Sequence, residues 1–245
     1  MNNFILPDWP APISVRALVT TRRGGVSVGP YASFNLADHV GDDPQAVAAN
    51  RKLLRERVPQ LPADPLWLKQ VHGVACIAVE SSAPGIEADA SWSRTPGKVC
   101  AVLTADCLPL LLCDEKGSIV SAVHAGLQGL AKGVIEAAVK TLPVPPASLL
   151  AWMGPAIGPK AFEVGPDVRD QFLAHDAKAA MAFTSSAKGK WLGDLYLLAR
   201  QRLHELGVTR IYGGGECTVT DARHFYSFRR DRDTGRMASL IWLAV

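Results

Sequence analysis

Five short apolar runs between residues 66 and 124 constrain the fold more than any other part of the sequence. Each run is bounded by Gly, Pro, Ser or charged residues, a pattern that is typical of buried strands and too short for helices. The runs cover residues 66–71, 76–79, 99–103, 108–113 and 119–123. We therefore expect buried β-strands throughout the middle of the chain.

The segments on either side alternate between helix and strand patterns. Asp43 followed by Pro44 is a typical helix start, with a capping acceptor and Pro at the first helical position, and this helix should run up to Pro59. Further helices are predicted at residues 129–142, 168–175 and 195–206, and further strands at residues 15–21, 149–153, 209–212 and 237–242. Because strands recur on both sides of every candidate boundary, we expect one α+β domain over residues 1–245, with mixed central β-sheets flanked by helices.

Composition and charge narrow the classes of function. Lys and Arg number 26 against 23 Asp and Glu, and the net charge of +3 is too small to indicate a nucleic-acid surface or a polybasic membrane anchor. The apolar stretch 99–113 contains Asp106 and Pro109 and falls short of the roughly 20 residues that a bilayer requires. No Lys or Arg precedes Arg16, which argues against a secretory signal. The 5 cysteines are scattered and form no disulfide framework, so we expect a cytoplasmic protein with a small-molecule substrate and no nucleic-acid or membrane partner.

Metal-ligand side chains lie at the ends of three predicted strands. They are His72 in KQVHG, Cys107 in ADCLP and His124 in AVHAG. Two imidazoles and one thiolate would leave one position of a tetrahedral site open, which is the arrangement of catalytic zinc. Spacing alone is equally consistent with a buried, inert Cys107 and two ordinary strand-end histidines.

Several polar side chains are candidates for contacting a substrate. Arg22 ends a predicted strand, and the two glycines after Arg23 would let a phosphate approach the backbone, although a surface arginine is the alternative. Arg229 and Arg230 follow three aromatic residues that would either stack on a base or pack in the core. Asp106 precedes Cys107 and would orient a ligand or accept a proton.

Longer motifs surround these residues. They read KQVHG at 69–73, TADCLPLLLCD at 104–114, AVHAG at 122–126, GPAIGP with FEVG at 154–165, and FYSFRRD with TGRMASLIWL at 225–243. In this order they resemble the YfiH or laccase-domain family of bacterial proteins. TTRRGGVS at 20–27 and SFNLADHVGDD at 33–43 extend the resemblance over nearly the whole chain.

The resemblance implies a layered α/β fold and a zinc site formed by His72, Cys107 and His124. It implies an enzyme that takes purine nucleosides and phosphate, deaminates adenosine and cleaves methylthioadenosine, and bacterial members are also tied to peptidoglycan editing. Asn35 matches a family position for a polar contact, whereas a turn residue is its other interpretation. Arg22 would bind the phosphate.

The laccase label of the family suggests copper, but the residues favour zinc. A blue-copper site also uses two His and one Cys, yet a multicopper oxidase needs further His-rich centres. The chain has 6 histidines, and His175 and His204 lie in predicted helices outside any matching motif. A single zinc ion at an open site polarises phosphate or generates hydroxide near neutral pH, which suits phosphorolysis and deamination.

Two departures from the family pattern keep other functions open. Leu127 and Gln128 stand where the family reads Trp-Arg, and Lys160 and Ala161 stand where the family has a Cys pair. One alternative is a metal-free cysteine hydrolase or peptidoglycan-editing amidase, with Cys107 as nucleophile and a histidine as base. The other is a purine-binding protein without catalysis.

Overall fold

The largest sheet holds most of the predicted strands. In the computed structural model, which describes residues 4–245, it has six strands in mixed orientation. In sheet order they are β12 (Arg210–Gly213), β8 (Leu149–Met153), β6 (Leu108–Asp114), β7 (Val120–Ala125), β4 (Ala90–Ser93) and β3 (Cys76–Ala78). Strand β6 pairs antiparallel with both β7 and β8, while β12 with β8 and β3 with β4 pair parallel.

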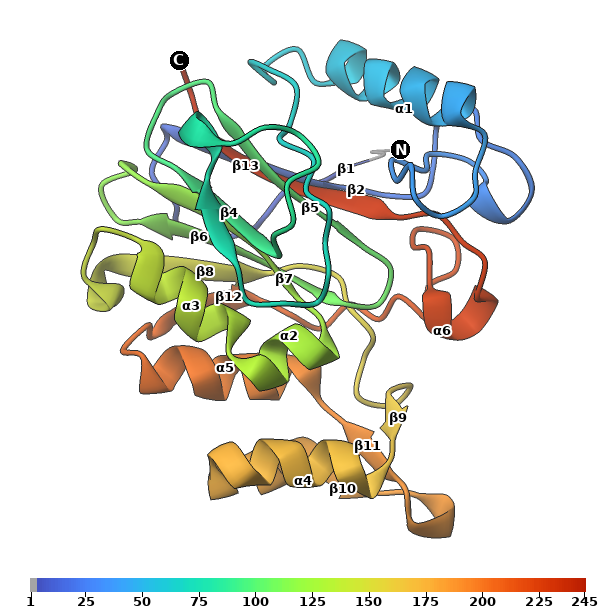
Figure 1. Cartoon of the computed structure of the whole chain (residues 1–245), viewed down its shortest axis with the longest axis vertical. Coiled ribbons are helices and arrows are strands. Elements are labelled where there is room, and N and C mark those ends of the chain that lie inside the picture. The colour runs from blue at the N-terminus through green and yellow to red at the C-terminus, as the bar shows by residue number, and fades with distance from the viewer. Residues whose placement is uncertain (1–3) are drawn as a thin grey trace.

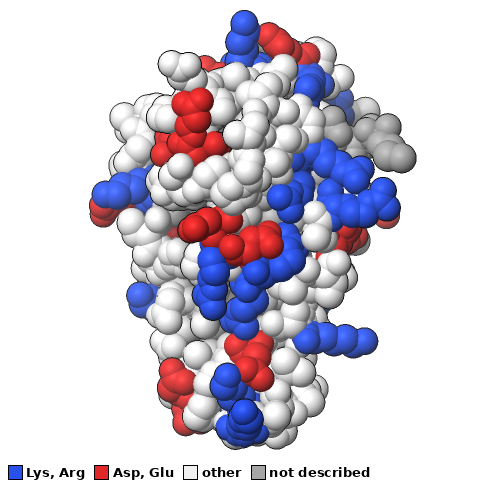
Figure 2. All heavy atoms as spheres, turned by 90° about the vertical axis from the view of Figure 1, so that its right-hand side faces the viewer, with Lys and Arg blue, Asp and Glu red and all other residues white. Residues whose placement is uncertain are grey.

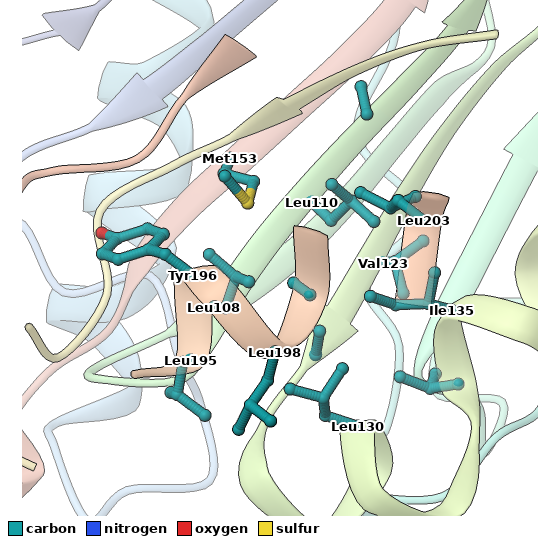
Figure 3. Close-up of a cluster of buried hydrophobic side chains, with 14 of the residues drawn as sticks. Leu108, Leu110, Val123, Leu130, Ile135, Met153, Leu195, Tyr196, Leu198 and Leu203 are labelled. Carbon is teal, nitrogen blue, oxygen red and sulfur yellow. The ribbon is translucent and has the colours of Figure 1, made fainter. Parts of the chain in front are cut away.

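The side chains of β6 fill two different cores, because successive residues of a strand point to opposite faces. Leu110 packs on one face with side chains of α3 (Val134–Thr141) and α5 (Leu195–Glu205), as Figure 3 shows. Leu111 packs on the other face against a second sheet. Burial on both faces explains why this strand reads as a continuous apolar run without alternation.

The second sheet is antiparallel and lies between the first sheet and a helix. Its strands, in order, are β1 (Phe4–Ile5), β2 (Val15–Thr20), β13 (Met237–Leu243) and β5 (Val99–Thr104). Its outer face packs on α1 (Pro44–Arg57), which Asp43 caps by accepting a hydrogen bond from Gln45 N at 3.0 Å. The layers therefore run α1, second sheet, first sheet, α3 with α5 (Figure 1), as the expected sheets flanked by helices require.

A third, small sheet projects below these layers in Figure 1 together with α4 (Pro166–His175). Its strands, in order, are β10 (Phe183–Ser185), β11 (Trp191–Gly193) and β9 (Glu163–Val164). This sheet was not predicted from the sequence, because strands of two or three residues are too short to show a periodic pattern. The remaining short elements are α6 (Phe228–Asp231) and 3-10 turns at Gly29–Tyr31, Val79–Ser81, Pro146–Ser148, Ala177–Ala182 and Ala187–Gly189.

The prediction of a strand over residues 66–71 is wrong. Only Leu66 and Lys69 form isolated bridges there. The side chain of Gln70 takes the place of backbone pairing, since its Nε2 donates to Leu103 O at 2.9 Å and its Oε1 accepts from Leu103 N at 2.7 Å. The segment therefore borders β5 through a side chain and is free to curve away.

The predicted helix over residues 129–142 is two helices, α2 (Leu127–Lys132) and α3. Gly133 separates them with φ = +94°, a left-handed conformation that ends the first helix. The hydrophobic spacing continued across the break because both helices bury their apolar faces in the same core. The other predicted helices are observed within a few residues of their expected bounds.

The charges of the surface are mixed. On the face drawn in Figure 2, clusters of Lys and Arg are interrupted by Asp and Glu. Among residues 4–245, no helix has both the length and the apolar character needed to cross a bilayer.

Truncation of Leu110 should test the two-sided packing of β6. Leu110→Ala removes a side chain that is 0% exposed, and we expect it to lower the free energy of unfolding by about 2–5 kcal/mol through lost burial and a residual cavity. The matched control is Leu6→Ala, because Leu6 is 67% exposed and should change stability little. Urea unfolding measures both, and equal losses would contradict the assignment of Leu110 to the core.

Candidate metal centre

A cavity of about 390 Å³ opens where the turn between β5 and β6 meets the end of β7. Its walls combine apolar side chains with a few polar and charged ones. Those that matter below are His72, Asp106, Cys107, His124, Phe162, Phe228, Arg229 and Arg236. The cavity thus holds all three metal-type ligands expected from the sequence.

Three separate segments bring these ligands together. His72 lies on the irregular segment before β3, Cys107 in the turn between β5 and β6, and His124 near the end of β7. Their donor atoms lie within 4.8 Å of one another, and Cys107 Sγ is 3.8 Å from His72 Nε2. His72 is exposed, Cys107 is partly buried and His124 is buried. The arrangement could hold a metal ion.

The buried carboxylate of Asp89 orients two of the ligands. Its Oδ1 accepts from His72 N at 2.9 Å and lies 2.8 Å from His124 Nδ1. Its Oδ2 accepts from Gly73 N at 2.6 Å and from Val71 N at 3.2 Å. Because Nδ1 of His124 is engaged, Nε2 is the nitrogen left for the cavity, as is usual for a metal-binding histidine.

The Cys107 thiol and His124 form an ion pair in the metal-free protein. Burial opposes the Cys107 thiolate, but the charge of His124 and contacts with His124 and His72 outweigh it and lower the pKa to about 6. Burial likewise opposes the charged form of His124, and the attraction of Cys107 and Asp89 raises its pKa to about 9. Between these values Cys107 is a thiolate and His124 an imidazolium.

The separation of the Cys107 and His72 donor atoms, 3.8 Å, is close to that in a tetrahedral zinc site. Zinc ligands at about 2.3 Å (sulfur) and 2.0–2.1 Å (nitrogen) lie roughly 3.6 Å apart, close to the separation of Cys107 Sγ and His72 Nε2. Gly126 keeps the space between the ligands open, since a Cβ there would come within 2.8 Å of Cys107 Sγ and 3.4 Å of His124 Nε2. The donor set and the missing side chain both agree with a bound metal.

Asp106 joins the Cys107 turn to the C-terminal part of the chain. Its Oδ1 accepts from Thr218 Oγ1 at 2.5 Å and its Oδ2 from Arg229 N at 2.6 Å. Arg229 lines the cavity, stacks over Phe162 at 5.4 Å and donates through Nη1 to Glu163 O. Asp106 thus fixes the backbone of a cationic residue at the cavity wall.

The structure places the remaining sequence candidates, Arg22, Asn35 and Arg230, away from the cavity lining. Arg22 donates through Nε to Ala32 O at 3.0 Å and through Nη1 to Ala222 O at 3.2 Å, and its guanidinium lies 4.7 Å from the centre of the Tyr226 ring. Asn35 is 0% exposed, and its Oδ1 accepts from Arg236 N at 2.9 Å. Asn35 therefore acts through Arg236 and not by direct contact with a ligand in the cavity.

Sequence reasoning missed Asp89, Gly126 and Arg236 as site residues. Asp89 precedes a strand too short and polar to predict, and Gly126 and Arg236 were read only as parts of motifs. Gly126 and Arg236 lie inside the motifs AVHAG and TGRMASLIWL, which gives them no role, and Asp89 lies in none of the motifs. Only the folded chain brings them to the cavity.

The ion pair predicts an unusually reactive cysteine in the metal-free protein. Cys107 should be alkylated at neutral pH with a midpoint near pH 6, because the thiolate persists down to its lowered pKa. Cys76 and Cys113, whose burial raises the pKa of each to about 12, should not react there. Peptide mass spectrometry after iodoacetamide treatment across pH measures each cysteine, and a Cys107 midpoint near the ordinary value of about 8.5 would refute the pair.

Filling the space at Gly126 should prevent metal binding. Gly126→Ala places a Cβ among the ligand atoms, so we expect the metal content of the purified protein to fall well below one ion per chain. Leu127→Ala is the matched control, since Leu127 lines the cavity next to Gly126 without standing between the ligands. Elemental analysis measures both, with circular dichroism to verify folding, and full metal occupancy in Gly126→Ala would show that the ion lies elsewhere.

Comparison with known proteins supports one family for the whole chain. Residues 16–244 match the family model described as multi-copper polyphenol oxidoreductase laccase. The chain is 55% identical over 244 residues to a purine nucleoside phosphorylase of Pseudomonas aeruginosa, with 99% of each chain covered. It is 52% identical over 244 residues to the purine nucleoside phosphorylase YfiH of Escherichia coli, covering 99% of this chain and 100% of the relative.

A solved structure agrees with this relationship. The crystal structure of a Neisseria meningitidis protein superimposes with a TM-score of 0.95 at 48% sequence identity, and the match covers 100% of both chains. Sequence and fold thus agree over the length of the chain that carries the three ligands. The chain belongs to the YfiH family of laccase-domain proteins.

Proposed function

We propose that this protein is a zinc-dependent purine nucleoside phosphorylase. The observation that carries the proposal is a set of two imidazoles and one thiolate, with room for a further ligand, in a cavity lined by cationic and aromatic side chains. The names of the relatives at 55% and 52% identity support the same activity. Deamination of adenosine and phosphorolysis of methylthioadenosine at the same site belong to the proposal.

His72, Cys107 and His124 would hold the ion, and the donor set favours zinc over copper. Imidazole and thiolate suit both metals, but the described residues 4–245 offer one such cluster and none of the further His-rich centres of a multicopper oxidase. A zinc ion bound there would supply a concentrated positive charge and an open coordination position.

Phosphorolysis would require this chain to position two substrates in line. An oxygen of phosphate forms a bond to C1′ of the ribose, the bond from C1′ to the purine nitrogen breaks, and the electron pair leaves with that nitrogen, which gains a proton. Phe162 and Phe228 offer aromatic surface to the purine, and Phe228 is 48% exposed at the rim. Arg229 contributes a cation, which Asp106 holds in place through the backbone.

A second candidate function rests on the ion pair between Cys107 and His124. A thiolate beside an imidazolium is also the nucleophile and base of cysteine hydrolases, and Asp89 would orient the histidine. In that mechanism the thiolate attacks an amide carbonyl to form a thioester, and the histidine gives its proton to the leaving amine. Water then cleaves the thioester, releases the carboxylic acid and restores the thiolate and the protonated histidine. The enzyme would need no metal.

Replacement of Cys107 separates the two functions. Cys107→Ser should lower metal content and reduce phosphate-dependent turnover of adenosine, inosine and methylthioadenosine together, by roughly two orders of magnitude or more, since a Lewis acid contributes several kcal/mol. Cys76→Ser is the control, because Cys76 lies in β3 outside the cavity. Metal stoichiometry and product formation are measured per folded molecule.

Each alternative has its own result in this experiment. Amide hydrolysis by metal-free wild type that is lost in Cys107→Ser would establish the hydrolase. Purine binding without turnover in the metal-loaded wild type would identify a binding protein. Full metal occupancy with unchanged turnover in Cys107→Ser would contradict the assignment of Cys107 as a metal ligand.

A further inference from the structure

Arg236 brings a cation into the metal cavity, where it has no direct ion pair with a carboxylate of the described residues. It lines the same cavity as His72, Cys107 and His124, yet within residues 4–245 no carboxylate forms an ion pair with it. The charges of Asp106 and Cys107 attract Arg236, but the oxygens of Asp106 accept their hydrogen bonds from Thr218 Oγ1 and Arg229 N and not from Arg236. Because no direct ion pair within this part of the chain offsets the desolvation of Arg236, an anion bound in the cavity would stabilise this cation.

The backbone of Arg236 is held from two sides. Its N–H donates to Asn35 Oδ1 at 2.9 Å, and Asn35 is in turn fixed by Ala37 and by Asp42. The preceding Gly235 packs so tightly that a Cβ would come within 2.7 Å of Tyr226 Cζ and 2.9 Å of Asn35 Cβ. The backbone from which the Arg236 side chain extends is therefore held in place.

One edge of the Arg236 guanidinium makes no hydrogen bond within the described residues and is available to a ligand. Both N–H groups of Nη1 have backbone acceptors, Thr234 O at 2.7 Å and Gly235 O at 3.0 Å. Of the five N–H donors of a guanidinium, the three on Nε and Nη2 then have no partner among the described residues. The edge formed by Nε and Nη2 is the one that binds two oxygens of a carboxylate or phosphate side by side.

The guanidinium of Arg22 does not offer such an edge to the cavity. Its Nε and Nη1 are bound to the carbonyls of Ala32 and Ala222, its ring contact is with Tyr226, and it does not line the cavity. Arg229 does line the cavity but lies over Phe162. Of the three arginines, Arg236 alone combines a free bidentate edge, a fixed backbone and a place in the wall shared with Cys107.

We propose that Arg236 is the phosphate-binding residue of this site, with the Nε and Nη2 edge taking two oxygens of inorganic phosphate. This inference rests on the proposed phosphorolysis, because phosphate is the nucleophile of that reaction. Arg236 would hold the anion beside the ligand cluster while a third oxygen faces the ribose. Asn35 is a positioning residue that acts through the backbone of Arg236.

Binding of inorganic phosphate tests the proposal without any nucleoside. Calorimetric titration of phosphate into the metal-containing full chain at constant ionic strength should show affinity reduced roughly 10- to 100-fold in Arg236→Gln, the loss of hydrogen bonds to a charged group. Arg236→Lys should recover only part of the affinity, because it keeps the charge without the bidentate edge. Metal content and the KM for nucleoside should stay at wild-type values, while the KM for phosphate rises.

Two further variants complete the comparison. Arg94→Gln removes an exposed arginine outside the cavity and controls for net charge, and Arg22→Gln tests the residue indicated by the sequence. Unchanged phosphate affinity in Arg236→Gln would overturn the proposal, as would a loss of phosphate affinity seen only in Arg22→Gln. The same holds if Arg236→Gln weakens the binding of a nucleoside 5′-monophosphate but not that of inorganic phosphate. If Arg236→Gln fails to fold, wild-type affinity in Arg236→Lys overturns it equally. A wild type that binds phosphate through Arg236 but turns over no nucleoside would refute the proposed function and leave this inference standing.

Discussion

The carboxylate of Asp89 ties together two segments that carry ligand-type side chains, one leading into the six-stranded sheet and one within it. One segment is irregular and carries His72, and the other is β7, which carries His124. Burial alone would raise the pKa of Asp89, but hydrogen bonds from His124 and the backbone of Gly73 lower it. The group therefore stays ionised at neutral pH and binds three successive amides as well as the imidazole. This carboxylate thus helps to set the distance between His72 and His124, whose rings also pack together with centroids 4.8 Å apart.

The third ligand depends on the packing of the two large sheets. Strand β5 belongs to the four-stranded sheet and β6 to the six-stranded sheet, so the turn that carries Asp106 and Cys107 crosses from one sheet to the other. Asp106 has φ = +88°, a left-handed conformation that is costly outside glycine, and its two hydrogen bonds to distant segments stabilise it. The position of Cys107 is thus coupled to the core between the sheets.

The elements that were predicted correctly from the sequence are those with a clear local pattern. Continuous apolar runs predicted β5, β6 and β7, because strands buried on both faces have no polar alternation, and the Asp43 and Pro44 pair predicted the start of α1. His72, Cys107 and His124 were noticed because each lies beside a predicted apolar run, and the resemblance of the surrounding motifs to the YfiH family selected them as ligands. Asp89 and Arg236 were not noticed, since their roles come from contacts across the fold; the bond between Arg236 and Asn35 spans 201 residues. The strand expected at residues 66–71 failed because a side chain, Gln70, replaced backbone pairing.

The unequal exposure of His72, Cys107 and His124 would set the route by which an ion enters and leaves a site formed by them. Only His72 faces solvent freely, while His124 is 3% exposed and Cys107 lies between these extremes. If these residues hold an ion, the exposed imidazole of His72 would be the ligand most open to competition from water or a chelator. The rate of exchange would then follow the local motion of the segment around His72 and not the opening of the sheets. A site built this way can be loaded after the chain has folded.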